Sequence, residues 1–441
     1  MFAGLDRTWK GRIFAEMSRP YLDSAAPAAL FLQPKANPSP KGLGAVRTRH
    51  DRVGISPLIA RAYDPDDRNG KSAESGSPDN GSGPVWDPLL DGATSQSPVI
   101  DPDVQILTRT VADGRRPTPE RVLAFRDIID SEIGDTALTR VRNIERELNL
   151  RNLYLKFEGG NPTGTQKDRV AFAQAQDALR RGYDTVTLAS CGNYGAAMAL
   201  SCRLAGLRCL VFIPEGYTTR RVAEISDYGA EIRFQGQDYE AACDLSRATA
   251  RDRDYYDANP GGSNTALQLE AYAQIAYEIY DELRDAPAAV AVPVSNGTTL
   301  AGIHLGFTSL YRRCRTSRIP KMVAGSTYRK NPIVESWIKG YPECRDLDPT
   351  SIRESAVNEP LINWHSTDGS DALRAIRESG GWAAYTSDRA LRGAAKMLRD
   401  TDGLWVLPAS TAGFLALIEH HVGEPLPGDR YVAVITGKQL R

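Results

Sequence analysis

Lys167 is the residue of this chain whose surroundings best suit covalent chemistry. It stands in the segment Asn161-Pro-Thr-Gly-Thr-Gln-Lys-Asp-Arg169, between a predicted strand at residues 153–157 and a predicted helix at residues 170–180. A lysine at a helix N-terminus lies beside the positive end of the helix dipole, which lowers the pKa of its amine. The uncharged amine is the form that attacks a carbonyl group to give a Schiff base. The alternative, a solvated surface lysine followed by an Asp/Arg pair, does not explain the Asn-Pro-Thr-Gly turn.

This segment resembles the lysine segment of the pyridoxal-phosphate enzymes of the tryptophan synthase β fold (fold type II), which include threonine synthase, cysteine synthase and the serine/threonine dehydratases. The resemblance implies an α/β fold with two parallel or mixed sheets, in a large and a small domain. It also implies that Lys167 carries pyridoxal 5'-phosphate as a Schiff base. Thr165 and Gln166 stand where the family usually has a serine and an apolar or aromatic residue.

A second loop joins a strand predicted at residues 185–189 to a helix predicted at residues 194–204. Backbone N–H groups at such a helix start suit an amino-acid carboxylate. The loop resembles the family's "S-x-G-N-T" motif, which binds the substrate carboxylate and supplies an asparagine to the 3-hydroxyl group of the cofactor. The resemblance implies substrate contacts from Ser190, Cys191, Gly192, Asn193 and Tyr194, with Asn193 also on the cofactor. Tyr194 replaces the usual threonine, which suggests a remodelled substrate side. The alternative is an ordinary helix cap by Asn or Ser.

A third loop lies between an apolar strand predicted at residues 289–294 and a helix predicted at residues 300–313. Pro293 lacks an N–H group, so regular strand pairing should stop near it. Small residues allow backbone N–H groups to close on a phosphate, and threonine hydroxyl groups add donors. The loop resembles the family's glycine-rich cup for the cofactor phosphate, although it has fewer glycines. The resemblance therefore implies cofactor contacts from Ser295, Asn296, Gly297, Thr298 and Thr299.

The segment Val434-Ile-Thr-Gly437 closes the last predicted strand, residues 431–435. It resembles the "T-G" close of threonine synthase, in which the threonine hydroxyl group meets the pyridine nitrogen of the cofactor, and it implies this role for Thr436. Ser410 and Thr411 are rivals, because the cysteine synthase branch takes its hydroxyl group from that segment. A neutral partner leaves the nitrogen unprotonated and the electron sink weaker, which favours elimination and replacement over transamination.

The composition argues against several classes of function. The 441 residues have a formal net charge of −1, so the whole chain shows no charge footprint for nucleic acid or an anionic membrane. No run is long and apolar enough to span a bilayer. The six cysteines form no CxxC pair, and without a secretory signal we expect reduced thiols in a cytoplasmic protein. No metal is expected, because the histidines lack metal-ligand spacing; they include His304, His365, His420 and His421.

Composition also divides the chain into two parts. Residues 1–102 form an N-terminal extension, in which residues 2–22 are a short helix or a floppy segment and residues 64–97 a disordered linker. Residues 103–441 form the catalytic domain, with a small mobile subdomain at about residues 172–262. Strands alternating with helices predict parallel sheets with right-handed crossovers. Further strands are predicted at 208–213 and 231–235, helices at 119–130, 219–228, 239–251 and 265–283, a turn and strand at 133–141, and later elements at 321–325, 390–399, 404–407 and 412–420.

The resemblance implies elimination or replacement on an amino acid that carries a β- or γ-leaving group. Threonine synthase takes the γ route with O-phosphohomoserine, and cysteine synthase takes the β route with an O-activated serine. The close at Thr436 favours the first. The segment Ile133-Gly-Asp-Thr-Ala-Leu138 resembles the "I-G-N-T-P-L" of cysteine synthase and favours the second. Two further hypotheses are a paralogue that makes an unusual amino acid and a non-catalytic binding protein that keeps the fold. We expect a homodimer with a small amino acid as its partner molecule.

Overall fold

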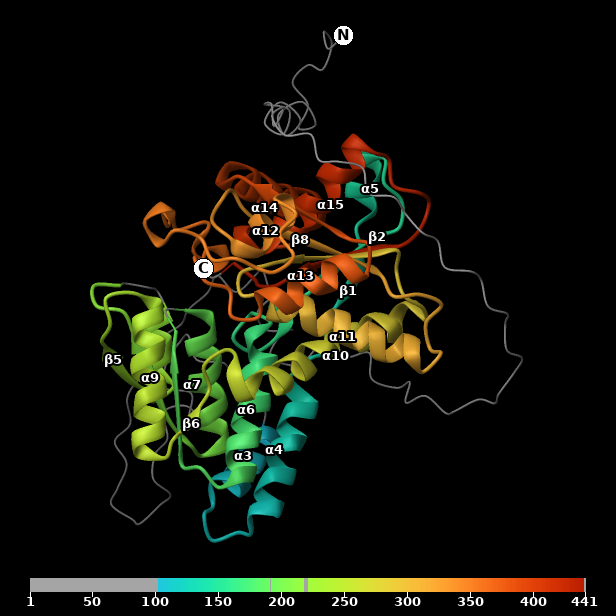
Figure 1. Cartoon of the computed structure of the whole chain (residues 1–441). Coiled ribbons are helices and arrows are strands. Elements are labelled where there is room, and N and C mark those ends of the chain that lie inside the picture. Colours follow the sequence, from blue (N-terminus) through green and yellow to red (C-terminus); the bar gives the residue numbers. More distant parts are fainter. Residues whose placement is uncertain (1–101, 191, 218–220, 440–441) are drawn as a thin grey trace, which may run out of the picture.

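The computed structural model describes residues 102–190, 192–217 and 221–439 (Figure 1). The predicted N-terminal helix at residues 2–22, the predicted linker at residues 64–97 and Cys191 lie outside these ranges. Within the ranges, none of the helices combines the length and the apolar character that crossing a bilayer requires.

The larger of two sheets has six strands. In spatial order they are β1 (Leu138–Arg140), β2 (Leu153–Phe157), β10 (Tyr431–Ile435), β7 (Ala289–Pro293), β8 (Lys321–Thr327) and β9 (Trp382–Thr386). Only the β1–β2 pair is antiparallel. Every residue of β7 and β10 is buried, as expected for central parallel strands. Pro293 is the last residue of β7, which confirms that this strand ends where its missing N–H group predicts.

Helices cover both faces of this sheet. Because strand side chains alternate, Val290 and Val292 of β7 face one hydrophobic cluster, while Ala289 and Ala291 face another. The first cluster includes residues of α10 (Thr265–Leu283), α11 (Thr298–Arg312) and α13 (Gly369–Glu378). The second includes residues of α5 (Arg142–Leu148), α14 (Asp388–Asp402) and α15 (Ala412–Gly423). The result is a layered α/β unit with its core on both sides of the strands.

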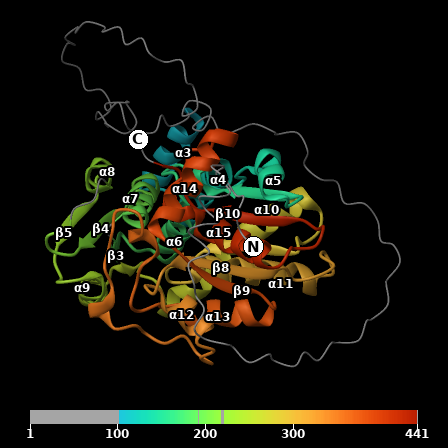
Figure 2. The same ribbon diagram turned by 90° about the horizontal axis from the view of Figure 1, so that it is seen from above.

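The smaller sheet has four parallel strands, which all lie between residues 185 and 257. In spatial order they are β5 (Glu231–Phe234), β4 (Arg208–Ile213), β3 (Thr185–Ala189) and β6 (Tyr256–Asp257). Helices α7 (Asn193–Ala205) and α9 (Tyr239–Arg253) pack on β3 and β4, and α8 (Arg221–Asp227) packs on α7. The two sheets lie side by side in the view from above (Figure 2). The predicted fold class, two parallel or mixed sheets in an α/β fold, is confirmed.

The remaining elements link or flank these units. The helices are α3 (Pro102–Ala112), α4 (Thr118–Glu132), α6 (Lys167–Arg181) and α12 (Pro332–Ile338), and the short 3-10 turns are η2 (Glu158–Gly160), η3 (Gly262–Asn264), η4 (Pro349–Ser351), η5 (Glu359–Leu361) and η6 (Pro408–Thr411). Helix α6 packs against α7 and α10 and so connects the two sheets. Residues 404–407, which the predicted alternation includes, hold only an isolated bridge between Val406 and Lys438.

Candidate active site

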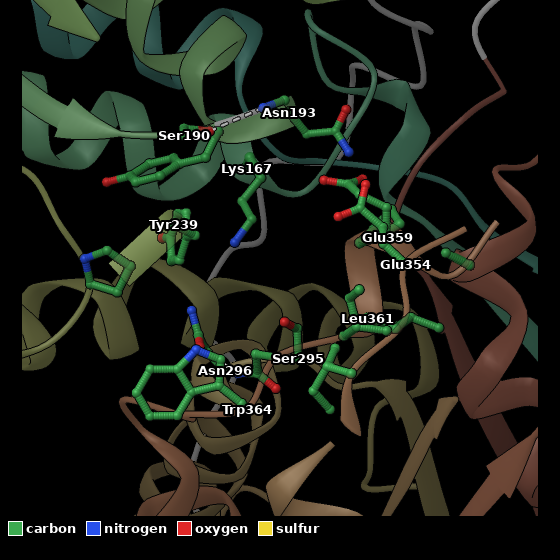
Figure 3. A pocket seen from close by; sticks show the side chains of 18 of the residues that line it. Lys167, Ser190, Asn193, Tyr239, Ser295, Asn296, Glu354, Glu359, Leu361 and Trp364 are labelled. Atoms are coloured by element: carbon green, nitrogen blue, oxygen red, sulfur yellow. Dashed lines mark hydrogen bonds between the residues drawn. The ribbon is translucent and has the colours of Figure 1, made fainter. Parts of the chain in front are cut away.

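A cavity of about 600 Å³ brings the four predicted segments together. It opens where the lysine turn, the ends of β3 and β7 and the end of β10 meet, as parallel α/β topology predicts. The lining includes all the predicted site residues that the structure describes: Lys167, Ser190, Gly192, Asn193, Tyr194, Ser295, Asn296, Gly297, Thr298, Thr299 and Thr436. Figure 3 shows the Lys167 side chain extending into this cavity.

Lys167 is the first residue of α6, and its amine has a pKa close to neutral pH. Burial lowers the pKa of this amine, and the negative charge of Asp368 partly opposes that effect, so that the pKa is about 8. The helix end named in the sequence argument is therefore not the main cause; removal from water is. The Lys167 Nζ atom lies 5.5 Å from the centre of the Tyr194 ring.

Asp168 and Arg169, the two residues after the lysine, anchor the lysine turn through separate buried contacts. The Asp168 carboxylate accepts hydrogen bonds from the backbone N–H of Thr163, at 2.9 Å, and from its hydroxyl group, at 2.8 Å. Arg169 pairs with Glu158 at 2.6 Å and with Glu278 at 2.7 Å. Both Asp168 and Arg169 are buried, so the solvated surface pair considered from the sequence is not what the chain contains.

The loop after β3 is organised by its own side chains. The Ser190 Oγ atom accepts hydrogen bonds from the backbone N–H groups of Gly192, at 3.3 Å, and Gly195, at 2.8 Å. Ser190 therefore satisfies two N–H groups at the start of α7, although the N-cap residue of this helix is Gly192 and not the Asn or Ser of the simpler interpretation. The Asn193 Oδ1 atom accepts a hydrogen bond of 3.1 Å from the buried Arg221. The carbonyl end of Asn193 is thus used within the protein, which leaves its amide N–H₂ group as the end that can serve a ligand.

Tyr194, where the family motif has threonine, uses its hydroxyl group to hold the protein interior together. The hydroxyl group donates to the backbone carbonyl of Ala258 at 2.7 Å and also pairs with the Gln174 side chain. The residue is 7% exposed, and its ring faces the Lys167 amine. Replacement of threonine by tyrosine therefore places an aromatic ring in the cavity wall, while the polar group is consumed elsewhere.

The loop after β7 forms the start of α11, and glycine is required in it. Gly297 has a φ of 92°, in the left-handed region, and a Cβ atom there would lie 2.6 Å from the Cβ of Ala372. The α11 N-terminus opens on the cavity and can receive an anion. The Thr298 hydroxyl group donates to Asp368, a carboxyl group that is 4% exposed and whose pKa burial raises. Sequence reasoning did not single out this acid behind the predicted phosphate cup.

The three candidate hydroxyl groups at the end of the chain occupy different surroundings. Thr436 lines the cavity. The Ser410 hydroxyl group donates to the backbone carbonyl of Leu407 at 2.5 Å, and that of Thr411 donates to Pro408 at 2.7 Å. Both rivals are buried and do not line the cavity. Thr436 is the one of the three that a cavity ligand can reach.

One wall of the cavity was missed from the sequence. It comes from residues 349–364, where the structure has two short 3-10 turns and no strand or longer helix. Asn363 donates a hydrogen bond of 2.9 Å to the Oδ1 atom of Asn296 and so joins this segment to the loop after β7. Without helical or strand periodicity, no pattern marks these residues in advance.

Comparison with known proteins identifies the family. The family model described as "Pyridoxal-phosphate dependent enzyme" matches residues 129–437, more than half of the chain. The chain belongs to this family. Its cofactor is therefore pyridoxal 5'-phosphate, and it is an enzyme of the lyase and synthase type within the family. Among the described residues, no three His, Cys, Asp or Glu side chains gather in a way that could hold a metal ion.

The chain is similar to several threonine synthases in sequence and to other enzymes in fold. The chain is 32% identical over 313 residues to a threonine synthase from Methanocaldococcus jannaschii, covering 70% of this chain and 75% of the relative. It is 30% identical over 310 residues to a threonine synthase from Bacillus sp. (strain ULM1), covering 70% and 83%. In fold it is similar to maize serine racemase, with a TM-score of 0.60, 18% identity and coverage of 73% and 94%. It is also similar in fold to a threonine deaminase from Solanum lycopersicum, with a TM-score of 0.60 and 15% identity, covering 74% of this chain and 92% of the deaminase chain.

The residues present fit the cofactor. An amine of lowered pKa stands inside a cavity of about 600 Å³, with room for a small aromatic ring and an amino acid. The N-terminus of α11 faces the same space and supplies N–H groups for a phosphate. Thr436 and Asn193 border the cavity as further polar contacts.

Proposed function

We propose that this enzyme catalyses elimination or replacement on an α-amino acid that carries a β- or γ-leaving group, in the manner of threonine synthase. Lys167 is the residue that holds the cofactor and moves the proton. The observation that carries the proposal is the Lys167 amine, whose pKa is about 8, inside the cavity where the loops after β3, β7 and β10 meet.

Lys167 suits a base that removes a proton from the α-carbon of an amino acid. An amine with a pKa of about 8 is partly uncharged near neutral pH, so it can accept a proton. The protonated amine is still acidic enough to give the proton back. The bound cofactor draws electrons from the α-carbon and so makes its proton acidic. The Tyr194 ring, 5.5 Å from the Lys167 Nζ atom, limits the space through which the amine moves.

Other residues of the cavity orient the two ligands. The N–H groups at the start of α7, beside Ser190 and Asn193, suit the substrate carboxylate, and those at the start of α11 suit the cofactor phosphate. The Thr436 hydroxyl group, which lines the cavity, would be a neutral partner for the pyridine nitrogen of the bound cofactor. A neutral partner favours elimination and replacement over transamination.

The first test is the colour of the protein. Purified full-length protein should show a visible absorption band from the cofactor, and Lys167→Ala should abolish it. Lys396→Ala is the matched control, because that side chain is 66% exposed and outside the cavity, and its band should be unchanged. A wild-type protein that stays colourless with added pyridoxal phosphate would contradict the proposal.

A substrate panel separates the two routes. Release of phosphate from O-phosphohomoserine is expected for the γ route, and release of acetate from O-acetylserine or phosphate from O-phosphoserine for the β route. Turnover of a serine ester with none of O-phosphohomoserine would reject threonine synthase chemistry in favour of the cysteine synthase route.

The non-catalytic binding protein considered from the sequence does not agree with the enzyme family to which the chain belongs. Two groups that the resemblance assigns to ligands are used within the protein: the Asn193 carbonyl accepts from Arg221, and the Thr298 hydroxyl group donates to Asp368. Bound cofactor without turnover of any amino acid in a broad panel would contradict the proposed reaction.

The assembly and the location of the protein are also proposals. We infer a homodimer in the cytoplasm, with a small amino acid as its partner molecule. Mass measurement in solution tests the dimer, and fractionation of the producing cell tests the location.

A further inference from the structure

One wall of the cavity is acidic. Among the described residues that line it, Lys167 is the one side chain with a basic group, whereas five carry carboxyl groups: Glu215, Asp238, Glu240, Glu354 and Glu359. Figure 3 shows Glu354 and Glu359 next to each other and directed into the cavity. Both belong to the segment between α12 and α13 that closes this side.

Three of the five carboxyl groups, those of Asp238, Glu240 and Glu359, accept a hydrogen bond from a neutral donor within the protein. Asp238 accepts a hydrogen bond of 2.8 Å from the backbone N–H of Ala241 and so caps α9. Glu240 accepts a hydrogen bond from the Trp364 ring nitrogen. Glu215 is exposed at the rim. The pair Glu354 and Glu359 lies on the segment that closes the cavity, so a ligand in the cavity meets this pair.

Within the part of the chain that the structure describes, this pair has no cationic partner. No described lysine, arginine or histidine forms an ion pair with either Glu354 or Glu359. Burial raises the pKa of Glu359, and the neighbouring charge of Glu354 raises it further, although the Tyr217 hydroxyl group donates a hydrogen bond to it. Two carboxyl groups held together, one of them half-buried, carry an electrostatic cost that a bound cation would relieve.

The negative charge of this cavity wall favours some classes of substrate over others. A phosphate ester such as O-phosphohomoserine would bring two negative charges into a cavity whose carboxylates at Glu354 and Glu359 form no ion pair with any described residue. A terminal ammonium or guanidinium group would instead be attracted, with charge-assisted hydrogen bonds. We propose that the substrate is an α-amino acid whose side chain carries a cationic group, and that Glu354 and Glu359 bind it. This inference rests on the proposed function, in that the cavity must bind an amino acid.

The test uses three amino acids of matched size. L-ornithine, L-norvaline and L-glutamate have side chains of similar length that end in a cation, a methyl group and an anion. Calorimetric titration of the full-length protein should give ornithine a dissociation constant about tenfold lower than norvaline, and glutamate one higher than norvaline. Glutamate or O-phosphohomoserine binding as tightly as ornithine would overturn the proposal.

Variants assign the effect to the pair. In Glu359→Gln the Tyr217 hydroxyl group still has an oxygen to which it donates, so the fold should persist while the preference for ornithine over norvaline disappears. Glu354→Gln should reduce the preference less, because Glu354 is more exposed. Glu147→Gln, on the exposed side of α5, should leave it unchanged. An unchanged preference in Glu359→Gln and Glu354→Gln would reject their role.

Failure of this inference is distinguishable from failure of the proposed function. A protein with a cofactor band and turnover, but no preference for ornithine, contradicts the inference alone. A protein without a cofactor band contradicts the proposed function, while the calorimetric ranking of the three amino acids still decides the charge that the cavity prefers.

Discussion

The Lys167 amine and the buried Asp368 carboxyl group, which accepts a hydrogen bond from Thr298, affect each other's charge. Because Asp368 raises the pKa of Lys167, which burial has lowered to about 8, removing this acid should lower it further. Capture of added pyridoxal phosphate needs the uncharged amine, so its rate in cofactor-free protein should rise with pH and level off above about 8. In Asp368→Asn this rise should move to lower pH.

Stopped-flow absorbance at the visible band measures the capture rate at each pH. Asp400→Asn is a control of the same chemical change at an exposed site outside the cavity. An inflection that stays in place in Asp368→Asn, or that moves to higher pH, would show that Asp368 does not act on this amine.

Tyr194 gives a second prediction at the scale of a single residue. Tyr194→Phe removes the hydroxyl group that bonds Ala258 and Gln174 but keeps the ring beside Lys167. Because both partners are buried, the free energy of unfolding should fall by about 1–3 kcal/mol. The visible band should be retained, since the hydroxyl group is bonded to Ala258 and Gln174 and the ring beside Lys167 is kept. Denaturant titration measures the first effect and absorbance the second; loss of the band with unchanged stability would be the contrary result.

At the scale of elements, the start of α6 depends on a buried ionic network. Arg169 joins Glu158 of η2 to Glu278 of α10, and Lys156 of β2 pairs with Glu278 at 2.5 Å. Arg169→Met leaves the two carboxylates with one fewer cation in the interior. We expect the free energy of unfolding to fall by about 3–5 kcal/mol and cofactor binding to weaken as the lysine turn loosens.

Urea unfolding followed by circular dichroism measures this loss. Arg180→Met, which breaks an exposed pair with Asp177 on the same helix, should change stability by less than about 1 kcal/mol. Equal effects of the two substitutions would mean that burial of the Arg169 network contributes nothing.

The elements with strong patterns were predictable, and the short ones were not. The strands at residues 185–189, 208–213 and 431–435 and the helix at residues 265–283 have the bounds that sequence alone predicts. Strand β6 has two residues, too few for any periodicity, and β9 is an edge strand of half-buried side chains. The helices α3, α5, α12 and α13 were also missed.

Part of the active site was likewise predictable from the sequence, and part was not. Four of its loops could be placed because the ends of parallel strands meet at one edge of a sheet. The segment at residues 349–364 could not, because tertiary contacts position it. Asn331, for example, donates to the backbone carbonyls of Val294 and Leu361 and to the Asn363 side chain. The role of Arg221 was missed for the same reason, since its partners Thr163 and Asn193 lie far away in sequence.

At the scale of the whole molecule, we predict that the N-terminal extension, residues 1–102, can be removed without loss of the catalytic domain. Every described residue that lines the cavity lies between Thr165 and Thr436. We therefore expect a variant that lacks residues 1–102 to keep the visible band and the turnover of the full chain. A lower subunit count by light scattering would assign the extension to assembly, and an unchanged count would reject that role. Loss of the band would show that the extension supports the catalytic domain itself.

Strand β10 has a place in the sheet that affects how the protein is made. It lies between β2 and β7, which precede it in the chain, and the segment after it clamps the lysine turn: the Gln166 N–H donates to the Thr436 carbonyl and the Lys438 N–H to that of Gly164. While the ribosome is still translating, the middle of the sheet is therefore a gap. A nascent chain that stalls before Tyr431 would already contain its reactive lysine but would lack the two backbone hydrogen bonds that Thr436 and Lys438 make to the lysine turn. Pyridoxal phosphate should therefore join a chain translated past this point more readily than a stalled one.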